Sequence, residues 1–246
     1  MKKGTRGCLF FGLEAGQNNS CKAGMRRAFV IMLRHYLPIA CTMKRPHIEI
    51  IAVAHKRLGE LKVFVQSILN QDRPNWALKV IHDGPDAEFE STMRRFAKES
   101  GGRISFFCTS TRYNDYGHSL REQGLDQASG DFVLLTNADN YYVPRFIEFV
   151  TEAIEQTKPD AVMYDMVHSH DNPGGRGTPA YSAFNTEYGR LQMDMGAVVV
   201  RRELAMQAGF PDKSHDGDAT YFERVARIKG QATAVCKIKR VLMVHN

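Results

Sequence analysis

Three polar side chains directly follow a short apolar run in the middle of the chain. Residues 132–135 are apolar, too few for a helix and bounded by turn-forming residues, so they predict a buried strand. Asn137, Asp139 and Asn140 come just after it, at the edge where an open α/β sheet places ligand-binding groups. A carboxylate flanked by amides at such an edge suits a hard divalent cation that carries phosphate. The alternative is an Asn/Asp turn that leads into the next helix.

Two further acids stand at the ends of other predicted elements. Asp83 follows a second strand, and Asp218 opens a late helix. Each alone could be a turn or helix-cap residue. Together with Asp139 they fall at element edges on one side of an alternating strand and helix pattern, and this favours one shared site.

The elements that must position these acids alternate along the chain. Residues 58–70, for example, place Leu61, Phe64, Val65 and Ile68 on one helical face. The predicted strands are 47–55, 76–82, 103–108, 132–135, 160–166, 195–200 and 233–244, and the predicted helices are 58–70, 87–98, 118–128, 145–156, 202–207 and 216–228. This alternation predicts the α/β class, with a mostly parallel central sheet flanked by helices.

One polar, turn-rich segment, residues 168–186, interrupts the alternation. Long irregular segments in compact domains commonly serve as substrate loops, so we expect the acceptor determinants here. The segment contains His168 and His170. A metal ion shared by these two histidines is not expected from the sequence.

The overall composition is that of a globular protein, with 43% hydrophobic residues. The net charge of +6 comes from residues 1–45, which carry nine Lys/Arg and one acid (+8), whereas the remainder has 24 Lys/Arg and 26 acids (−2). Nucleic-acid binding by the folded body is therefore not expected. Five scattered cysteines without a CxxC pair predict neither a zinc site nor a disulfide framework, and they favour a cytoplasmic location.

Residues 1–45 form the least regular part of the chain. They could be a cleaved leader, a basic amphipathic segment on an anionic membrane, or a weakly ordered extension. The extension is favoured because Met43 falls just before the first convincing strand. A further hypothesis is that residues 1–42 are upstream sequence, added by a wrong choice of the translation start site. Peripheral membrane contact through this segment stays open. Residues 46–246 are then predicted to form one domain.

Residues 46–246 resemble a family 2 glycosyltransferase with the GT-A nucleotide-sugar fold. The resemblance is carried in order by I-E-I-I-A-V-A-H-K-R, H-D-G-P, L-R-E-Q-G-L-D-Q-A-S-G-D-F-V-L-L, N-A-D, M-G-A-V-V-V-R-R-E-L-A-M-Q-A-G-F and G-D-A-T-Y-F-E-R. No single motif is specific, whereas their order and spacing together are. Such an enzyme moves a sugar from a nucleotide-diphosphate sugar, most often a UDP-sugar, to a hydroxyl of a saccharide or other acceptor.

The resemblance also implies roles for individual residues. Nucleotide-sugar contacts are implied for Ala54, His55, Arg57, Asp83, Arg121, Asn137 and Ala138. Asp139 is implied to bind Mn²⁺ or Mg²⁺, which would offset the charge of the departing diphosphate. Asp218 is implied to be the base that takes the acceptor proton, with inversion at the anomeric carbon. Asp216 is the alternative base, although a helix N-cap suits it better.

The sequence departs from the family pattern at the metal motif. Asn137 replaces the first acid of D-x-D, and Asn140 an acid often found after it, so only one carboxylate is left. A further ligand is expected, and His245 at the end of the last strand is the candidate, since imidazole suits Mn²⁺ better than Mg²⁺. Two other functions stay open: a nucleotidyltransferase, although a Gly-rich phosphate loop is lacking, and a catalytically idle sugar-nucleotide binder.

Overall fold

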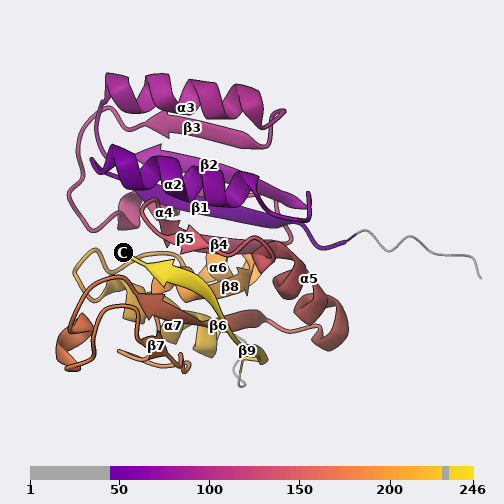
Figure 1. Ribbon diagram of the computed structural model, residues 1–246. Coiled ribbons are helices and arrows are strands. Elements are labelled where there is room, and N and C mark those ends of the chain that lie inside the picture. Colours follow the sequence, from indigo (N-terminus) through magenta and orange to yellow (C-terminus); the bar gives the residue numbers. More distant parts are fainter. Residues whose placement is uncertain (1–44, 229–232) are drawn as a thin grey trace, which may run out of the picture. The chain divides into compact units, whose positions relative to one another are not determined.

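The first strand, β1 (Ile48–Ala54), divides its side chains between two hydrophobic layers. Ile50 and Ala52 join the core under the helices α2 (Leu58–Leu69), α3 (Ala87–Glu99) and α5 (Phe146–Thr157). Ile51 and Val53 join the core under α4 (His118–Asp126), α6 (Arg202–Ala208) and α7 (Gly217–Arg227). Successive strand residues point to opposite faces, and all seven residues of β1 are buried, so helices have to cover the strand on both sides. Figure 1 shows these helices around the sheet, as the sequence predicts.

The computed structural model describes residues 45–228 and 233–246. The helices are α2 (Leu58–Leu69), α3 (Ala87–Glu99), α4 (His118–Asp126), α5 (Phe146–Thr157), α6 (Arg202–Ala208) and α7 (Gly217–Arg227), with short 3-10 helices η1 (Pro173–Gly175) and η2 (Met195–Ala197). The other strands are β2 (Trp76–His82), β3 (Ile104–Cys108), β4 (Phe132–Asn137), β5 (Tyr141–Tyr142), β6 (Ala161–His168), β7 (Ala183–Phe184), β8 (Val198–Arg201) and β9 (Val235–His245).

The strands form one sheet in the order β3-β2-β1-β4-β8-β6-β9-β5, with β7 paired to β6. The long pairs β1–β2, β1–β4, β2–β3 and β6–β9 are parallel. The antiparallel pairs, β4–β8, β5–β9, β6–β7 and β6–β8, each join only two or three residues. Parallel strands end at a common edge, and the loops after β1, β2 and β4 therefore meet there.

The structure corrects the sequence prediction at four short elements. The predicted strand 195–200 is a 3-10 turn, η2, followed by β8, and the predicted irregular segment contains both η1 and β7. Strand β5 was not predicted at all. Two-residue strands carry too little periodicity to be recognised, and their place is set by the partners β6 and β9.

Gly196 in η2 is tightly enclosed. A Cβ on it would lie 2.8 Å from Thr136 Oγ1 and the Tyr142 hydroxyl and 2.9 Å from Met243 Sδ. Overpacking typically costs about 1–3 kcal/mol, so Gly196→Ala should lower the free energy of unfolding by about that amount in urea denaturation. The matched control is Gly59→Ala in α2, where a Cβ meets no atom within 4 Å and should stabilise the helix slightly. Equal stability of Gly196→Ala and the parent protein would contradict this packing.

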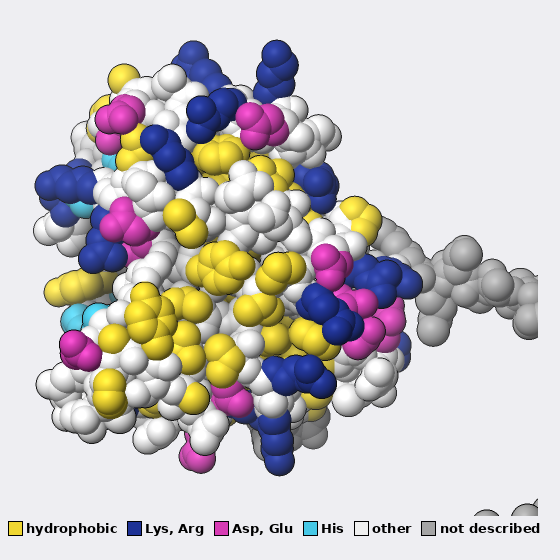
Figure 2. All heavy atoms as spheres, viewed as in Figure 1, with side chains coloured by type: hydrophobic (Ala, Val, Ile, Leu, Met, Phe, Trp, Pro, Cys, Tyr) yellow, Lys and Arg dark blue, Asp and Glu magenta, His cyan; other side chains and the backbone are white. Residues whose placement is uncertain are grey.

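Residues 45–246 form one compact unit. The predictions for residues 1–44, a weakly ordered extension and its membrane contact, lie outside the described residues. Within 45–228 and 233–246, no helix combines the length and apolar character that crossing a bilayer requires. On the face drawn in Figure 2, Lys and Arg side chains are scattered among Asp and Glu.

Candidate functional site

A cavity of about 370 Å³ opens where β1, β2 and β4 end, and we call it the strand-end cavity. Its volume falls within the range of about 300–1,000 Å³ that small-molecule sites occupy. The residues that line it are Val53, Ala54, His55, Asp83, Arg112, Asn114, Tyr116, Gly117, Leu120, Asn137 and Asp139. Five of the predicted site residues are thus brought together from three strand ends.

The other predicted donor-binding residues are not on this wall. Arg57 lies beside it, at the start of α2. Arg121 is buried with 2% of its surface exposed. Ala138 is buried, and its backbone N–H donates to the Val53 carbonyl at 2.9 Å. Ala138 therefore positions the loop after β4 through its backbone.

His55 has two unpaired nitrogens. Nδ1 and Nε2 are both buried, and neither has a hydrogen-bond partner among the described residues. The ring contacts His82 at a centroid distance of 5.8 Å. Buried polar atoms are nearly always paired in native proteins, so an unpaired imidazole in a cavity wall indicates a ligand that supplies the partner.

Asp83 holds the loop between β3 and α4 against the cavity. Its Oδ1 accepts the N–H of Tyr113 at 2.7 Å, and its Oδ2 accepts the N–H of Asn114 at 3.0 Å and lies 3.7 Å from Arg112 Nε. Each carboxylate oxygen can accept a further hydrogen bond. Contact of Asp83 with the base or ribose of a nucleotide stays a prediction.

Arg121 is a buried cation behind the cavity. It donates to Asn137 Oδ1 at 2.6 Å from Nη2 and to the Tyr116 carbonyl at 2.8 Å from Nη1. Its Nε has no hydrogen-bond partner within the described ranges. A buried charge that meets only neutral acceptors is costly, and the positive potential favours an anion such as a diphosphate nearby. Asn137 therefore contacts Arg121 as well as lining the cavity.

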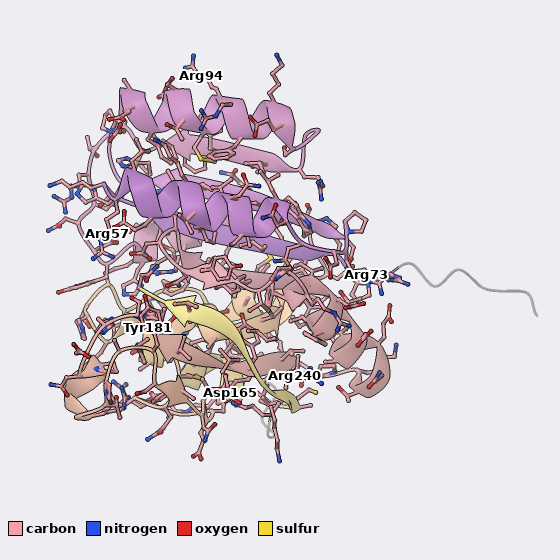
Figure 3. All side chains as sticks on the ribbon, in the orientation of Figure 1. Arg57, Arg73, Arg94, Asp165, Tyr181 and Arg240 are labelled. Carbon is pink, nitrogen blue, oxygen red and sulfur yellow. The ribbon has the colours of Figure 1, made fainter. Side chains whose placement is uncertain are left out.

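Asp139 offers one unpaired carboxylate oxygen. Its Oδ2 accepts a hydrogen bond from Arg57 Nη1 at 2.8 Å, whereas Oδ1 is buried and has no hydrogen-bond partner in the described part of the chain. Lys56 and Arg57 both adopt left-handed backbone angles, with φ of 57° and 49°, and such strain is common at functional sites. A buried, unpaired carboxylate oxygen fits a hard divalent cation. Figure 3 shows Arg57 at the end of the sheet where β9 ends, far from Arg73.

Asn140 is fully buried and holds the loop that carries Asp139. Its Nδ2 donates to Thr136 Oγ1 at 3.0 Å, and its Oδ1 accepts the Asn246 N–H at 3.3 Å. The Asn246 side-chain amide also binds the Asp139 carbonyl. The residue after β9 is thus fastened to the loop after β4.

Asp218 lies on the wall of a second cavity, of about 530 Å³, which we call the α7 cavity. Its Oδ1 is buried, has no hydrogen-bond partner among residues 45–228 and 233–246, and lies 3.6 Å from His118 Nδ1. Burial and the charge of Arg121 both lower the pKa of His118. The charge of Asp218 raises it, but the pKa is lowered overall. Tyr116 of the strand-end cavity contacts His215 of the α7 cavity at a centroid distance of 5.4 Å, so the two cavities adjoin.

Asp216 occupies the N-cap position of α7, as predicted, but its side chain caps no N–H. The carboxylate instead pairs with Arg190 at 3.0 Å and lies 3.3 Å from His215 Nδ1. The prediction of a capping side chain is therefore wrong, because the ion pair draws the carboxylate away from the helix end.

His245 has a partner at each ring nitrogen. Nε2 lies 3.3 Å from Asp194 Oδ2, and Nδ1 lies 3.3 Å from His168 Nδ1. Burial opposes protonation of His245, but the hydrogen bond and charge of Asp194 raise its pKa overall. Burial favours protonation of Asp194, but the hydrogen bond and charge of His245 lower its pKa. Joint metal binding by His245 and Asp139 stays a prediction.

His168 and His170 lie together, although the sequence gives no expectation of a shared ion. Residues two apart on a strand share a face, and the two rings stay close beyond the end of β6 at His168, with centroids 5.4 Å apart. With His245, the two offer ligand nitrogens that all lie within 4.8 Å of one another. Burial lowers the pKa of His168 to about 4, with the charges of His245 and His170 acting in the same direction.

Sequence reasoning missed several residues of the site. Arg112, Asn114 and Tyr116 line the strand-end cavity from the loop after β3. The polar run T-S-T-R-Y-N-D-Y-G follows a strand at the same edge as Asp83, and this signal could have found them. Asp194 precedes the M-G-A motif and becomes significant only when β9 brings His245 beside it.

A family model described as "Glycosyl transferase family 2" matches residues 49–206, well over half of the chain. The chain belongs to glycosyl transferase family 2. The matched range includes β1 from its second residue, the strand-end cavity and Asp194, whereas α7 with Asp218 lies beyond it. A search of curated proteins finds no match to this family member.

Solved structures share the fold of this family 2 domain. S. aureus TarS 1–349 superposes with a TM-score of 0.65 at 15% identity over 81% of this chain and 60% of that one. Mannosyltransferase PcManGT from Pyrobaculum calidifontis has a TM-score of 0.59 at 14% identity, and the match covers 90% of this chain and 64% of that one. GalNAc-T7 has a TM-score of 0.61 at 12% identity, and the match covers 81% of this chain and 43% of that one. The chain spans less than two thirds of each. At these identities the likeness shows the fold alone, and it confirms the predicted GT-A fold class.

Proposed function

We propose that the chain transfers a sugar from a nucleotide-diphosphate sugar to a hydroxyl of a saccharide or other acceptor. A UDP-sugar is the favoured donor. One observation carries the proposal: His55, Arg121 and Asp139 leave polar atoms unpaired in and behind one cavity of a family 2 domain. A nucleoside diphosphate offers hydrogen-bonding groups for the imidazole and negative charge for the guanidinium. The scattered cysteines support a cytoplasmic location, with membrane contact through residues 1–45 as an option.

The donor class is supported by what similar structures contain. TarS 1–349 was solved with UDP and with UDP-GlcNAc, and GalNAc-T7 with UDP, GalNAc and Mn²⁺. PcManGT was solved with GDP-Man and Mn²⁺, so a GDP-sugar is the second donor to test. We propose that Asp139 binds Mn²⁺ or Mg²⁺ through Oδ1, with His245 as the second ligand implied by the family resemblance. When bound, the cation offsets charge on the departing diphosphate.

Asp218 is proposed as the base. An acceptor hydroxyl placed in the α7 cavity would give its proton to Asp218 as its oxygen bonds to the anomeric carbon. The bond from that carbon to the diphosphate breaks, and the nucleoside diphosphate leaves with the electron pair. Attack from the face opposite the leaving group inverts the anomeric carbon. The proposal is supported by the unpaired Oδ1 of Asp218 beside the strand-end cavity.

The test is slow donor hydrolysis, in which water replaces the unknown acceptor. The full chain is incubated with UDP-sugars and GDP-sugars, each with Mn²⁺, Mg²⁺ or EDTA, and free nucleoside diphosphate is measured. We expect release from one donor in the presence of Mn²⁺ and little release with EDTA. Absence of any nucleotide binding would overturn the proposal.

A catalytically idle sugar-nucleotide binder is the second candidate. It is favoured by the metal motif, because Asn137 Oδ1 is held by Arg121 and Asn140 is buried, which leaves Asp139 as the one carboxylate of that motif. Donor binding without hydrolysis, and without transfer to a broad panel of acceptors, would identify this candidate.

His55→Ala should weaken nucleotide binding. Hydrogen bonds from a ligand to the unpaired imidazole are worth about 1–1.5 kcal/mol, so the Kd for UDP should rise about tenfold in isothermal titration calorimetry. His47→Ala is the matched control, because His47 precedes β1 at the opposite edge of the sheet and should leave the Kd unchanged. An unchanged Kd for His55→Ala would remove His55 from the site.

A further inference from the structure

His118 opens helix α4 and is buried, with 1% of its surface exposed. Its ring stacks on Phe210 at a centroid distance of 5.3 Å, and Phe210 stacks in turn on Tyr221 of α7 at 4.8 Å. A Cβ on Gly217, the first residue of α7, would lie 2.6 Å from Nε2 of His118. The first turn of α7, which carries Asp218, is therefore packed directly against this imidazole.

Two contacts fix which nitrogen of His118 carries the proton. Nε2 lies 3.0 Å from the Ser214 carbonyl, which can only accept, so Nε2 is the N–H donor. Nδ1 lies 3.4 Å from Nη1 of Arg121, which can only donate, so Nδ1 keeps its lone pair. Burial and the neighbouring guanidinium charge both oppose a second proton on the ring. The same Nη1 donates to the Tyr116 carbonyl at 2.8 Å, so the longer contact uses the lone pair of Nδ1 only weakly.

The lone pair of Nδ1 meets the carboxylate of Asp218. Oδ1 of Asp218 is buried, lies 3.6 Å from Nδ1 of His118 and has no hydrogen-bond partner among the described residues. No hydrogen is available between the two atoms while the carboxylate is ionised. Once the carboxyl group holds a proton, it can donate an O–H···N hydrogen bond to Nδ1. A bond of about 2.8 Å requires an approach of about 0.8 Å, and catalytic hydrogen bonds commonly tighten when the reacting groups are bound.

We propose that His118 is a positioning residue for the base: its Nδ1 accepts a hydrogen bond from Asp218 as Asp218 takes the proton of the acceptor. The inference rests on the proposed function, in which Asp218 is that base. The acceptor O–H bond breaks, its electron pair bonds to the anomeric carbon, and the nucleoside diphosphate leaves with the electron pair of its own bond. The proton stays on Asp218, shared with neutral His118. The carboxyl torsion is broad, so a half-turn brings whichever oxygen is protonated to Nδ1.

The same contacts connect the base to the donor cavity. Arg121 donates to Asn137 of the strand-end cavity at 2.6 Å and contacts His118 at 3.4 Å. Tyr116, whose carbonyl accepts from Arg121, lines that cavity, and its ring centroid lies 6.2 Å from that of His118. His118 therefore holds the base at a fixed place relative to the donor, and it stabilises the base in the state that exists only after proton transfer.

The test is the single-turnover rate of donor hydrolysis by the full chain with Mn²⁺, using the UDP-sugar or GDP-sugar that the parent protein hydrolyses. His118→Gln can keep the N–H donor to the Ser214 carbonyl but offers no acceptor at the place of Nδ1, whereas His118→Asn presents its amide oxygen there. We expect His118→Gln to lower the rate about tenfold and His118→Asn to stay within about threefold of the parent protein. His47→Gln, the same change at the opposite edge of the sheet, should leave the rate unchanged. Equal rates for His118→Gln and the parent protein would overturn the proposal.

A double-mutant cycle separates a positioning role from a structural one. In the Asp218→Asn background, His118→Gln should lower the rate no further, because no carboxyl proton is left to share. A tenfold loss in both backgrounds would show that His118 only supports the fold, and this would refute the proposal. The Kd for UDP should stay unchanged in His118→Gln, which reports an intact donor cavity. If that variant does not bind UDP, His118→Leu, which has no acceptor but keeps an apolar contact with Phe210, takes its place in the same cycle.

Failure of this inference can be told apart from failure of the proposed function. If Asp218→Asn loses hydrolysis and His118→Gln does not, Asp218 is the base but acts without His118. If Asp218→Asn keeps the parental rate, or if the parent protein binds the donor without hydrolysing it, Asp218 is not the base. The role of His118 then falls together with that assignment.

Discussion

Asp218→Asn should lower the rate of donor hydrolysis by about 100- to 10,000-fold, the usual contribution of a positioned general base. The amide keeps the size of the carboxylate but cannot take a proton from water or an acceptor. Because Asp218 lines the α7 cavity and not the strand-end cavity, the Kd of the donor should stay unchanged. Single-turnover release of nucleoside diphosphate and calorimetric donor binding measure the two effects separately.

Asp216→Asn is the matched control for this experiment. Asp216 stands two residues earlier and lines the same cavity, but its carboxylate is engaged by Arg190. Its replacement should lower the hydrolysis rate far less than Asp218→Asn does. A large loss in Asp216→Asn together with near-parental hydrolysis in Asp218→Asn would transfer the role of base to Asp216.

Asp139→Asn should remove the metal dependence of nucleoside diphosphate binding. The amide keeps the shape of Asp139 but loses the charge at Oδ1 that fits a divalent cation. Disturbing even the outer contacts of a metal typically costs about 10- to 100-fold in affinity, so the enhancement of UDP binding by Mn²⁺ should fall at least about tenfold. Calorimetry with UDP in Mn²⁺ and in EDTA gives this enhancement directly.

Two controls isolate the charge of Asp139. Arg57→Ala breaks the ion pair between Arg57 and Asp139 but keeps the carboxylate of Asp139, so Mn²⁺ should still enhance UDP binding. Asp126→Asn removes a charge at the end of α4, away from the cavity lining, and should change nothing. If Mn²⁺ enhances UDP binding by Asp139→Asn as strongly as before, Asp139 does not hold the cation.

The long elements could be predicted from the sequence because their periodicity is strong. Strand β1 and helix α2 match their predicted ranges within one residue at each end, since all strand residues but Glu49 are apolar and the helix shows one apolar face. Asp83 and Asp139 could be placed at one edge for the same reason, because parallel strands end together. Both line the strand-end cavity.

The site residues and the short strand that could not be predicted depend on contacts between distant parts of the chain. Arg112 and Asp194 enter the site only through the packing of the loop after β3 and the pairing of β9 with β6. The histidine cluster also depends on such a contact, because His245 reaches His168 only through the pairing of β9 with β6. Strand β5 exists because β9 lies beside it.

Strand β9 is the last strand in sequence, yet it lies inside the sheet, between β6 and β5 (Figure 1). Its neighbour β6 begins about seventy residues earlier, so this pairing closes a long loop, a kind of contact that slows folding. Until β9 arrives, β6 presents an unpaired edge on that side, and such edges promote aggregation of nascent chains. The corner that holds Asp194, His245 and Asn246 is therefore among the last parts of the domain that a ribosome can complete.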